Sequence, residues 1–271
     1  MQPLSIKLLP CVLLSVFALV LPNGPCGAGE AKDLKASLAL LPGLADTPEK
    51  GAFVAVVKAM GEVYPDGKIS IELFPFARSM DNVLHGRADF HIPCFRNPEV
   101  DQSKLPYSTV TVKIGTLCMV IYSNEEKPMT AKLLTEAIAD YKNGKAFPYK
   151  IEGAAGIESQ YPFPVISSAF VDQSLKKTAL KRIDAVVWAQ EECDLTIKAF
   201  KLGNIHREAW RGFEDVIVIA NGPEGERINT LLSSLLNQLR DSGKLADLYS
   251  KIHLPYNDWQ PSKMGWPVYA P

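Results

Sequence analysis

The residues with the clearest chemical potential lie in one stretch, "PFARSMDNVLHGRADFHIPCFRNPE", residues 75–99. It brings the ring of Phe76, the guanidinium groups of Arg78 and Arg96 and the thiol of Cys94 next to one short apolar segment. A guanidinium binds a carboxylate through two parallel hydrogen bonds, and aromatic rings stack on flat groups. The stretch therefore predicts recognition of a small ligand with an anionic or π-rich part.

The elements that position these side chains alternate between strand and helix. The order is strand, helix, strand, helix, strand over residues 34–43, 47–63, 68–75, 79–86 and 88–95. Thr47 before Pro48 predicts an N-cap with proline at the first helical position, and Gly86 predicts the end of the second helix. This alternation is typical of a parallel α/β sheet with helical crossovers.

The second half of the chain has a similar order. A long β-rich run over residues 107–123 leads to a helix ending at Gly144, and then to a strand, a small-residue turn and a helix start within residues 149–160. The segments "VLHGRADFHIP" and "ALKRIDAVVWA" share one order of helix, basic turn, Asp and apolar strand. A second β-rich run at 213–223 precedes a helix broken at Ser242-Gly243. Two α/β lobes are therefore expected.

The first 31 residues differ from the rest. Lys7 precedes an apolar run of fourteen residues, "LLPCVLLSVFALVL", followed by small residues. This run has the length of a signal-peptide core and is short for a membrane span of about 20 residues. A lipoprotein is disfavoured, because prolines precede Cys11 and Cys26. We expect a cleavable signal peptide over residues 1–31 and export to the periplasm.

Composition excludes some classes of function. The net charge of -1 argues against a general nucleic-acid binder, which needs a basic face. Cleavage would leave Cys94, Cys118 and Cys193, whose wide spacing is not a disulfide framework. Buried free thiols are favoured, and one disulfide remains the alternative.

Three motifs, in this order, resemble the extracellular solute-binding proteins of the polar-amino-acid type, the receptors of ATP-driven importers. They are "PFARSMDNVLHGRAD", "ALKRIDAVV" and "LLNQLRDSGKLADLYSKI". The resemblance covers about residues 34–254. It implies a type 2 periplasmic-binding fold, with two lobes, two crossing hinge segments near 110–113 and 210–215, and a ligand cleft between the lobes. Lobe 1 would comprise residues 32–112, lobe 2 residues 113–212, and the return to lobe 1 residues 213–271.

The resemblance also implies the ligand-binding residues of lobe 1. Phe76 would stack on the ligand, with a core aromatic as the alternative. Pro93 and Cys94 follow the strand where related proteins place small hydroxyl residues. The usual Thr-x-x-Arg ending is absent, so Arg96 would clamp a carboxylate from a different position, or else pair with Glu99 or Asp101 at the surface. Arg78 would reach the cleft from the first turn of its helix.

In lobe 2, Gly153, Ala154 and Ala155 between a strand and a helix start would offer backbone N–H groups to an anion, or form a plain tight turn. Trp188 and Gln190 would also face the ligand. Related amino-acid receptors carry an aspartate where this chain has Ala189, so an ordinary α-amino acid is a doubtful ligand. The adjacent pair Glu191 and Glu192 is interpreted as a solvated turn.

The expected function is capture of a small polar or anionic organic solute by a monomer for a membrane permease of an ABC-type importer, with no cofactor, no metal and no nucleic acid. A sensor acting with a membrane partner in trans is the alternative. A hydrolyase on the same fold is less favoured, because none of the four histidines lies beside a nucleophile motif and no Gly-x-Ser-x-Gly, His-Glu-x-x-His or phosphate loop occurs.

Overall fold

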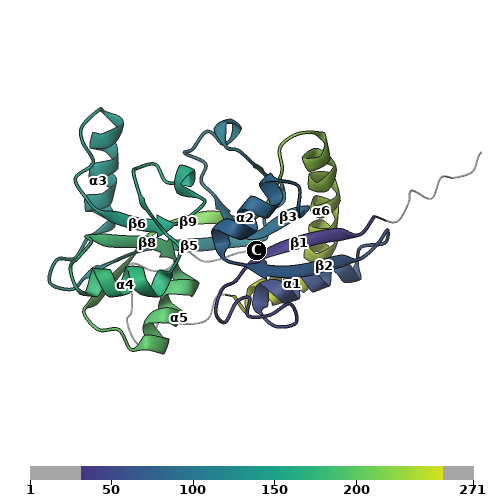
Figure 1. Ribbon diagram of the computed structural model, residues 1–271, viewed down its shortest axis with the longest axis horizontal. Helices are drawn as coiled ribbons and strands as arrows, with labels where there is room; N and C mark the ends of the chain where they lie inside the picture. The colour runs from purple at the N-terminus through teal and green to yellow at the C-terminus, as the bar shows by residue number, and fades with distance from the viewer. Residues whose placement is uncertain (1–31, 253–271) are drawn as a thin grey trace, which may run out of the picture. The chain divides into compact units, whose positions relative to one another are not determined.

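The computed structural model describes residues 32–252 (Figure 1). The predicted signal peptide over residues 1–31 lies outside the described residues, as does the Pro- and aromatic-rich segment after residue 252. Within the described part, strands form one mixed nine-stranded sheet in the order β2-β1-β3-β9-β5-β8-β6-β7, with β4 paired to β9. The strands are β1 (Leu34–Ala39), β2 (Ile69–Phe74), β3 (Phe90–Arg96), β4 (Ser108–Thr109), β5 (Gly115–Asn124), β6 (Ile151–Ala154), β7 (Ile166–Ser168), β8 (Ala185–Ala189) and β9 (Ile205–Ile219).

Most helices lie between the strands where they were predicted, but the helix over Gln190–Phe200 was not predicted. They are α1 (Ala52–Glu62), α2 (Phe76–Leu84), α3 (Ala131–Lys142), α4 (Val171–Ala179), α5 (Gln190–Phe200), α6 (Pro223–Asp241) and α7 (Lys244–Tyr249). Short 3-10 turns span Gln102–Lys104 and Glu158–Gln160. The predicted Ser242-Gly243 break separates α6 from α7, where Gly243 has a φ of 76° that favours glycine.

The first half of the sheet consists of β1, β2 and β3, which are parallel to one another. One prediction about its helices is wrong, because α1 begins at Ala52 and Thr47 does not cap it. Instead Thr47 Oγ1 accepts a hydrogen bond of 3.2 Å from the backbone N–H of Glu49, in a turn closed by backbone bonds between Thr47 and Lys50. Such a local side-chain bond competes with helix formation, so the proline-containing segment forms a turn.

The second half of the sheet consists of β6, β7 and β8, also parallel to one another. Helices α4 and α5 pack on each other and on β5 and β8. The expected helix start after residue 153 is absent, because β6 runs to Ala154 and only the 3-10 turn at 158–160 follows.

The two longest strands, β5 and β9, join the halves. On β9, Asp215 pairs with Phe95 of β3 on one side and with Gly115 of β5 on the other. The two predicted lobes therefore do not have separate sheets. The predicted crossing at 110–113 falls between β4 and β5, and that at 210–215 falls within β9. Their action as hinges, and the lobe boundaries, stay predictions.

Buried apolar side chains form two clusters on these elements. One cluster joins α1, α6 and α7 to β1 and to Ile217 and Ile219 of β9, and the other runs from α2 through β5 and β8. Alternate residues of β9 serve the two clusters, since Val216 and Val218 belong to the second. Successive side chains of a strand point to opposite faces of the sheet, and both faces of β9 are covered, so its residues alternate between the two clusters.

Candidate functional site

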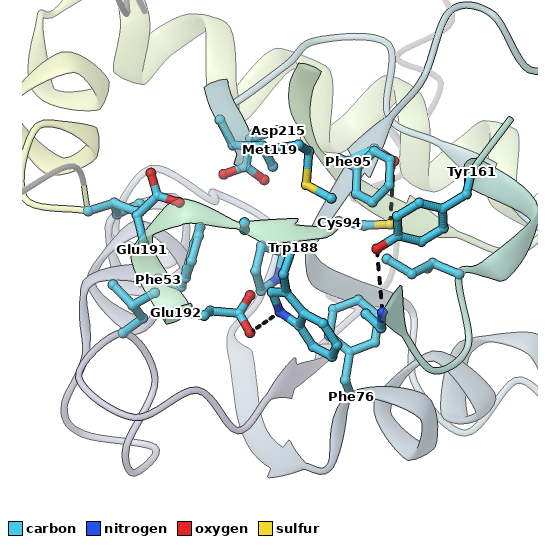
Figure 2. Close-up of a pocket in the computed structure, with 17 residues that line it drawn as sticks. Phe53, Phe76, Cys94, Phe95, Met119, Tyr161, Trp188, Glu191, Glu192 and Asp215 are labelled. Carbon is cyan, nitrogen blue, oxygen red and sulfur yellow. Dashed lines mark hydrogen bonds between the residues drawn. The ribbon is translucent and has the colours of Figure 1, made fainter. Parts of the chain in front are cut away.

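A pocket is lined by residues of both halves of the sheet (Figure 2). Phe76 follows the carboxyl end of β2, Ala154 ends β6 and Ala189 ends β8. Open α/β sheets bind ligands beyond the carboxyl ends of their strands, so the pocket occupies the position expected of a ligand site. Its open space is about 40 Å³, enough for about three water molecules.

Loops of the two halves touch beside this pocket. A Cβ atom added at Gly156, whose φ is 97°, would lie 3.3 Å from Cα of Ala77 on α2. On another side, a Cβ atom at Gly43 would lie 3.2 Å from Leu195 Cδ1 on α5. The two halves are thus in contact on two sides of the pocket.

Phe76 is the first residue of α2 and is half-buried at the pocket. Its ring meets the His91 ring edge-on, with centroids 4.9 Å apart. His91 Nδ1 is 2.6 Å from Ser79 Oγ, which is 2.9 Å from Ser37 Oγ, and these three buried groups hold α2 against β1 and β3. Burial lowers the pKa of His91 to about 3, so its imidazole is neutral and serves to position Phe76.

Pro93 and Cys94 also line the pocket. The β3–β9 register shifts between His91 and Cys94, where Pro93 has no N–H to donate to the ladder. The Cys94 thiol is 3% exposed, and burial and the nearby Asp215 raise its pKa. Cys94, Cys118 and Cys193 are buried free thiols.

The turn from β8 into α5 supplies the second wall. Trp188 lines the pocket, and its indole Nε1 donates a 2.7 Å hydrogen bond to Glu192 Oε2 (Figure 2). Glu191, only 3% exposed, and Glu192 both line the pocket, so the interpretation of this pair as a solvated turn is wrong. They open α5, whose first backbone N–H groups favour acidic side chains. Gln190 is buried and does not line the pocket.

The backbone N–H groups of Gly153, Ala154 and Ala155, predicted to bind an anion in lobe 2, are in a different arrangement in the structure. Gly153 and Ala154 belong to β6, and Tyr161 covers them: its Oη accepts a 3.4 Å bond from the Ala154 N–H and donates a 3.2 Å bond to Val187 O. The Ala155 N–H donates to Ser168 O at 2.9 Å. No helix begins here, so the predicted helix-terminal anion site is not formed. Of the three, Ala154 lines the pocket through its side chain.

The two arginines lie away from the pocket lining. Arg96 donates from Nε and Nη2 to Glu214 Oε2, at 2.8 and 2.7 Å, and from Nη1 to Thr109 Oγ1 at 3.1 Å. Its carboxylate partner is thus part of the protein, but this partner is Glu214 and not Glu99 or Asp101, which were predicted for a surface pair. The Arg78 side chain is 58% exposed, and its Nη1 lies 3.6 Å from Asp81 Oδ2. The geometry gives no support to an arginine clamp for an anionic ligand.

Sequence reasoning missed other lining residues, above all Asp215, Tyr161 and Phe53. Asp215 is 1% exposed, and its position after Glu214, directly before the apolar run "VIVIA", was a weak signal in the sequence. Burial and the neighbouring Glu191 raise its pKa well above the ordinary range. Phe53 and Tyr161 follow apolar patterns that fit any core position.

Residues 32–252 contain no group of three or more His, Cys, Asp and Glu side chains arranged to hold a metal ion. None of the helices in this range combines the length and hydropathy that a membrane span requires.

The fold belongs to the class of two-lobed periplasmic-binding-protein-like domains, which confirms the fold class that the resemblance implied. A scan against protein-family models and a search of curated proteins find no match. The GluR0 ligand-binding core from Nostoc punctiforme in complex with L-glutamate is similar, with a TM-score of 0.61, 13% identity, and coverage of 82% of this chain and 100% of that one. A histidine kinase sensor domain with similarity to periplasmic binding proteins gives a TM-score of 0.63, 16% identity, and coverage of 82% and 96%.

EhuB in complex with hydroxyectoine gives a TM-score of 0.59, 16% identity, and coverage of 83% of this chain and 90% of that one. Other similar structures include a substrate-binding protein of an amino-acid ABC transporter and an ancestral precursor of cyclohexadienyl dehydratase. At these identities the similarity establishes the fold alone.

Proposed function

We propose that this protein captures a small organic solute in the pocket between the two halves of its sheet. The observation that carries the proposal is the composition of the pocket wall, which combines Phe76 and Cys94 of one half with Trp188 and Glu192 of the other. A site shared by two halves binds best when they close, because contacts on both sides form together. The strands β5 and β9 supply the connections about which such closure would occur.

We further propose that the protein is exported to the periplasm and delivers its solute to the permease of an ABC-type importer. Several proteins of this fold are ABC transporter substrate-binding proteins, and the charged, apolar and small-residue order of residues 1–31 supports export. Binding is favoured over catalysis because no histidine of residues 32–252 lines the pocket and the buried His91 is held by Ser79.

A sensor that reports to a membrane partner in trans is the second candidate. The similarity to a histidine kinase sensor domain favours it. Solute uptake by cells lacking the protein separates the two functions: loss of uptake supports the importer, and unchanged uptake with a lost transcriptional response supports the sensor.

The test of solute binding is a thermal-shift screen of the purified protein with amino acids, organic acids, polyamines, quaternary ammonium compounds and sugars. A ligand of the native state raises Tm by mass action. Ala189→Phe fills the pocket, so we expect it to abolish the shift. Leu133→Phe, on the exposed face of α3, is the matched control and keeps it. An unaltered shift in Ala189→Phe contradicts binding at this pocket.

A further inference from the structure

The pocket that the proposed function assigns to a solute has an unusual charge balance, and the inference drawn from it rests on that function. Its polar lining includes the carboxylates of Glu192 and Asp215, on which the inference rests, while no lysine, arginine or histidine of the described residues lines it. An uncompensated carboxylate removed from water costs several kcal/mol, so a buried group of this kind holds a proton or receives a cation.

Asp215 has a free acceptor position. Its Oδ2 accepts a 3.3 Å hydrogen bond from Tyr249 Oη, whereas Oδ1 is buried and has no hydrogen-bond partner in residues 32–252. Buried polar atoms of native proteins are nearly always hydrogen-bonded, so an orphaned oxygen that lines a pocket marks a position for a donor. The charged or titratable groups that act on Asp215 are Cys94, Tyr249, Glu191 and Glu192, and none of these carries a positive charge.

Glu192 extends the same pattern to the opposite wall. Its hydrogen bond from Trp188 fixes one oxygen and leaves further acceptor capacity on the carboxylate. Burial, and then the charge of Glu191, raise the pKa of Glu192 to about 7, against the lowering effect of the Trp188 bond. No basic side chain of the described part opposes these effects.

Aromatic rings complete the wall. Trp188, Phe76 and Tyr161 line the pocket, and the face of an aromatic ring attracts an organic cation. The sulfur of Met119 and the side chain of Ile157 make the rest of the wall apolar. Such a wall favours a cation with a weakly hydrated, apolar flank over a strongly hydrated metal ion.

We propose that the solute is a small organic cation, with its ammonium or amidinium group between Asp215 and Glu192 and its apolar part against Trp188 and Phe76. The cation donates to the orphaned Asp215 oxygen and replaces the proton that the empty pocket holds. Binding therefore releases protons, and affinity rises with pH through the titration range of Glu192. The charge of this proposed ligand is opposite to that of the anionic ligand predicted from Arg78 and Arg96.

The test is isothermal titration of the full chain with agmatine and phenethylammonium, near neutral pH. The neutral isostere 2-phenylethanol is the control for phenethylammonium, and succinate and glutarate are the anionic controls. We expect at least one cation to bind and to release protons, and the neutral isostere to bind about tenfold or more weakly.

Two isosteric variants locate the charge. Asp215→Asn and Glu192→Gln each weaken the cation about tenfold or more, while Glu136→Gln, on exposed α3, leaves binding unchanged. Because Asp215 is fully buried, Glu192→Gln keeps the test valid if Asp215→Asn fails to fold.

Other outcomes overturn the inference in distinguishable ways. Binding of succinate or glutarate at the pocket, or equal binding of phenethylammonium and 2-phenylethanol, refutes the cation and leaves solute capture intact. Failure of every solute in this panel and in the thermal-shift screen refutes both the inference and the proposed function.

Discussion

The carboxylates at the start of α5 and on β9 fall into two sets with opposite arrangements. Asp194 on α5 is fully buried, forms an ion pair with Arg207 of β9, and accepts a 2.9 Å hydrogen bond from Tyr122 Oη. Glu192, one half-turn earlier, and Asp215, further along β9, have no such basic partner in the described residues.

The difference separates structural charge from charge available to a ligand. Burial raises the pKa of Asp194 to about 6, against the lowering effect of Arg207, so this carboxyl is ionised and paired at neutral pH. Asp194 has its cationic partner, Arg207, within the fold. Asp215 instead retains an unfilled acceptor at the pocket. A carboxylate whose cation the fold supplies stabilises the fold, and one whose cation is missing is a candidate for recognition.

The largest expected effect comes from breaking the complete pair. Arg207→Met leaves Asp194 as a buried, uncompensated charge and should lower the free energy of unfolding by about 3–5 kcal/mol. Urea unfolding near neutral pH measures this loss. Arg182→Met, at an exposed position before β8, is the control and should change stability by less than about 0.5 kcal/mol. Equal small effects in both variants would remove the distinction between the two sets.

An intermediate effect compares one substitution at two buried aspartates. Asp194→Asn leaves the Arg207 guanidinium buried without its carboxylate and should lower the free energy of unfolding by at least about 2 kcal/mol. Asp215→Asn leaves no cation behind and keeps an acceptor for Tyr249, so the free energy of unfolding should stay equal or rise above neutral pH. Comparable losses in the two variants would show Asp215 to be a structural group.

Much of the fold could be predicted from the sequence, because apolar periodicity and glycine positions are local signals. The α6–α7 break at Ser242-Gly243 and the strands β1, β2 and β8 follow such patterns. The joining of both halves into one sheet through β9 could not, since it depends on pairing between residues more than 100 positions apart, such as Phe95 with Asp215.

The candidate site was less predictable for a related reason. Phe76, after β2, and Trp188, near the end of β8, line the pocket, and their contact with a ligand stays a prediction. Arg96 does not line it, because its partner Glu214 comes from a strand formed 118 residues later. The positions of Glu191 and Glu192 at the pocket could not be predicted either. In the sequence alone, an acidic pair cannot be told from a solvated turn, because the difference depends on the packing around it.

The smallest expected effect tests the protonation of the pocket itself. Glu192 has its pKa raised from 4.5 to about 7, chiefly by burial, so between these values the folded protein binds a proton that the unfolded chain has lost. Stability gained from this proton is fully present below about pH 4.5 and is lost as pH rises to about 7. The pKa values of Asp194 and Asp215 are also raised, so the native protein should lose stability over this pH window. Glu192→Gln should make this pH dependence weaker without removing it.

Urea unfolding across the window, with Glu136→Gln as the matched control, measures the slope of stability against pH. A steeper fall in Glu192→Gln than in the native protein would mean that Glu192 is ionised throughout, with a positive group beside it, and the contrast with Asp194 would then disappear.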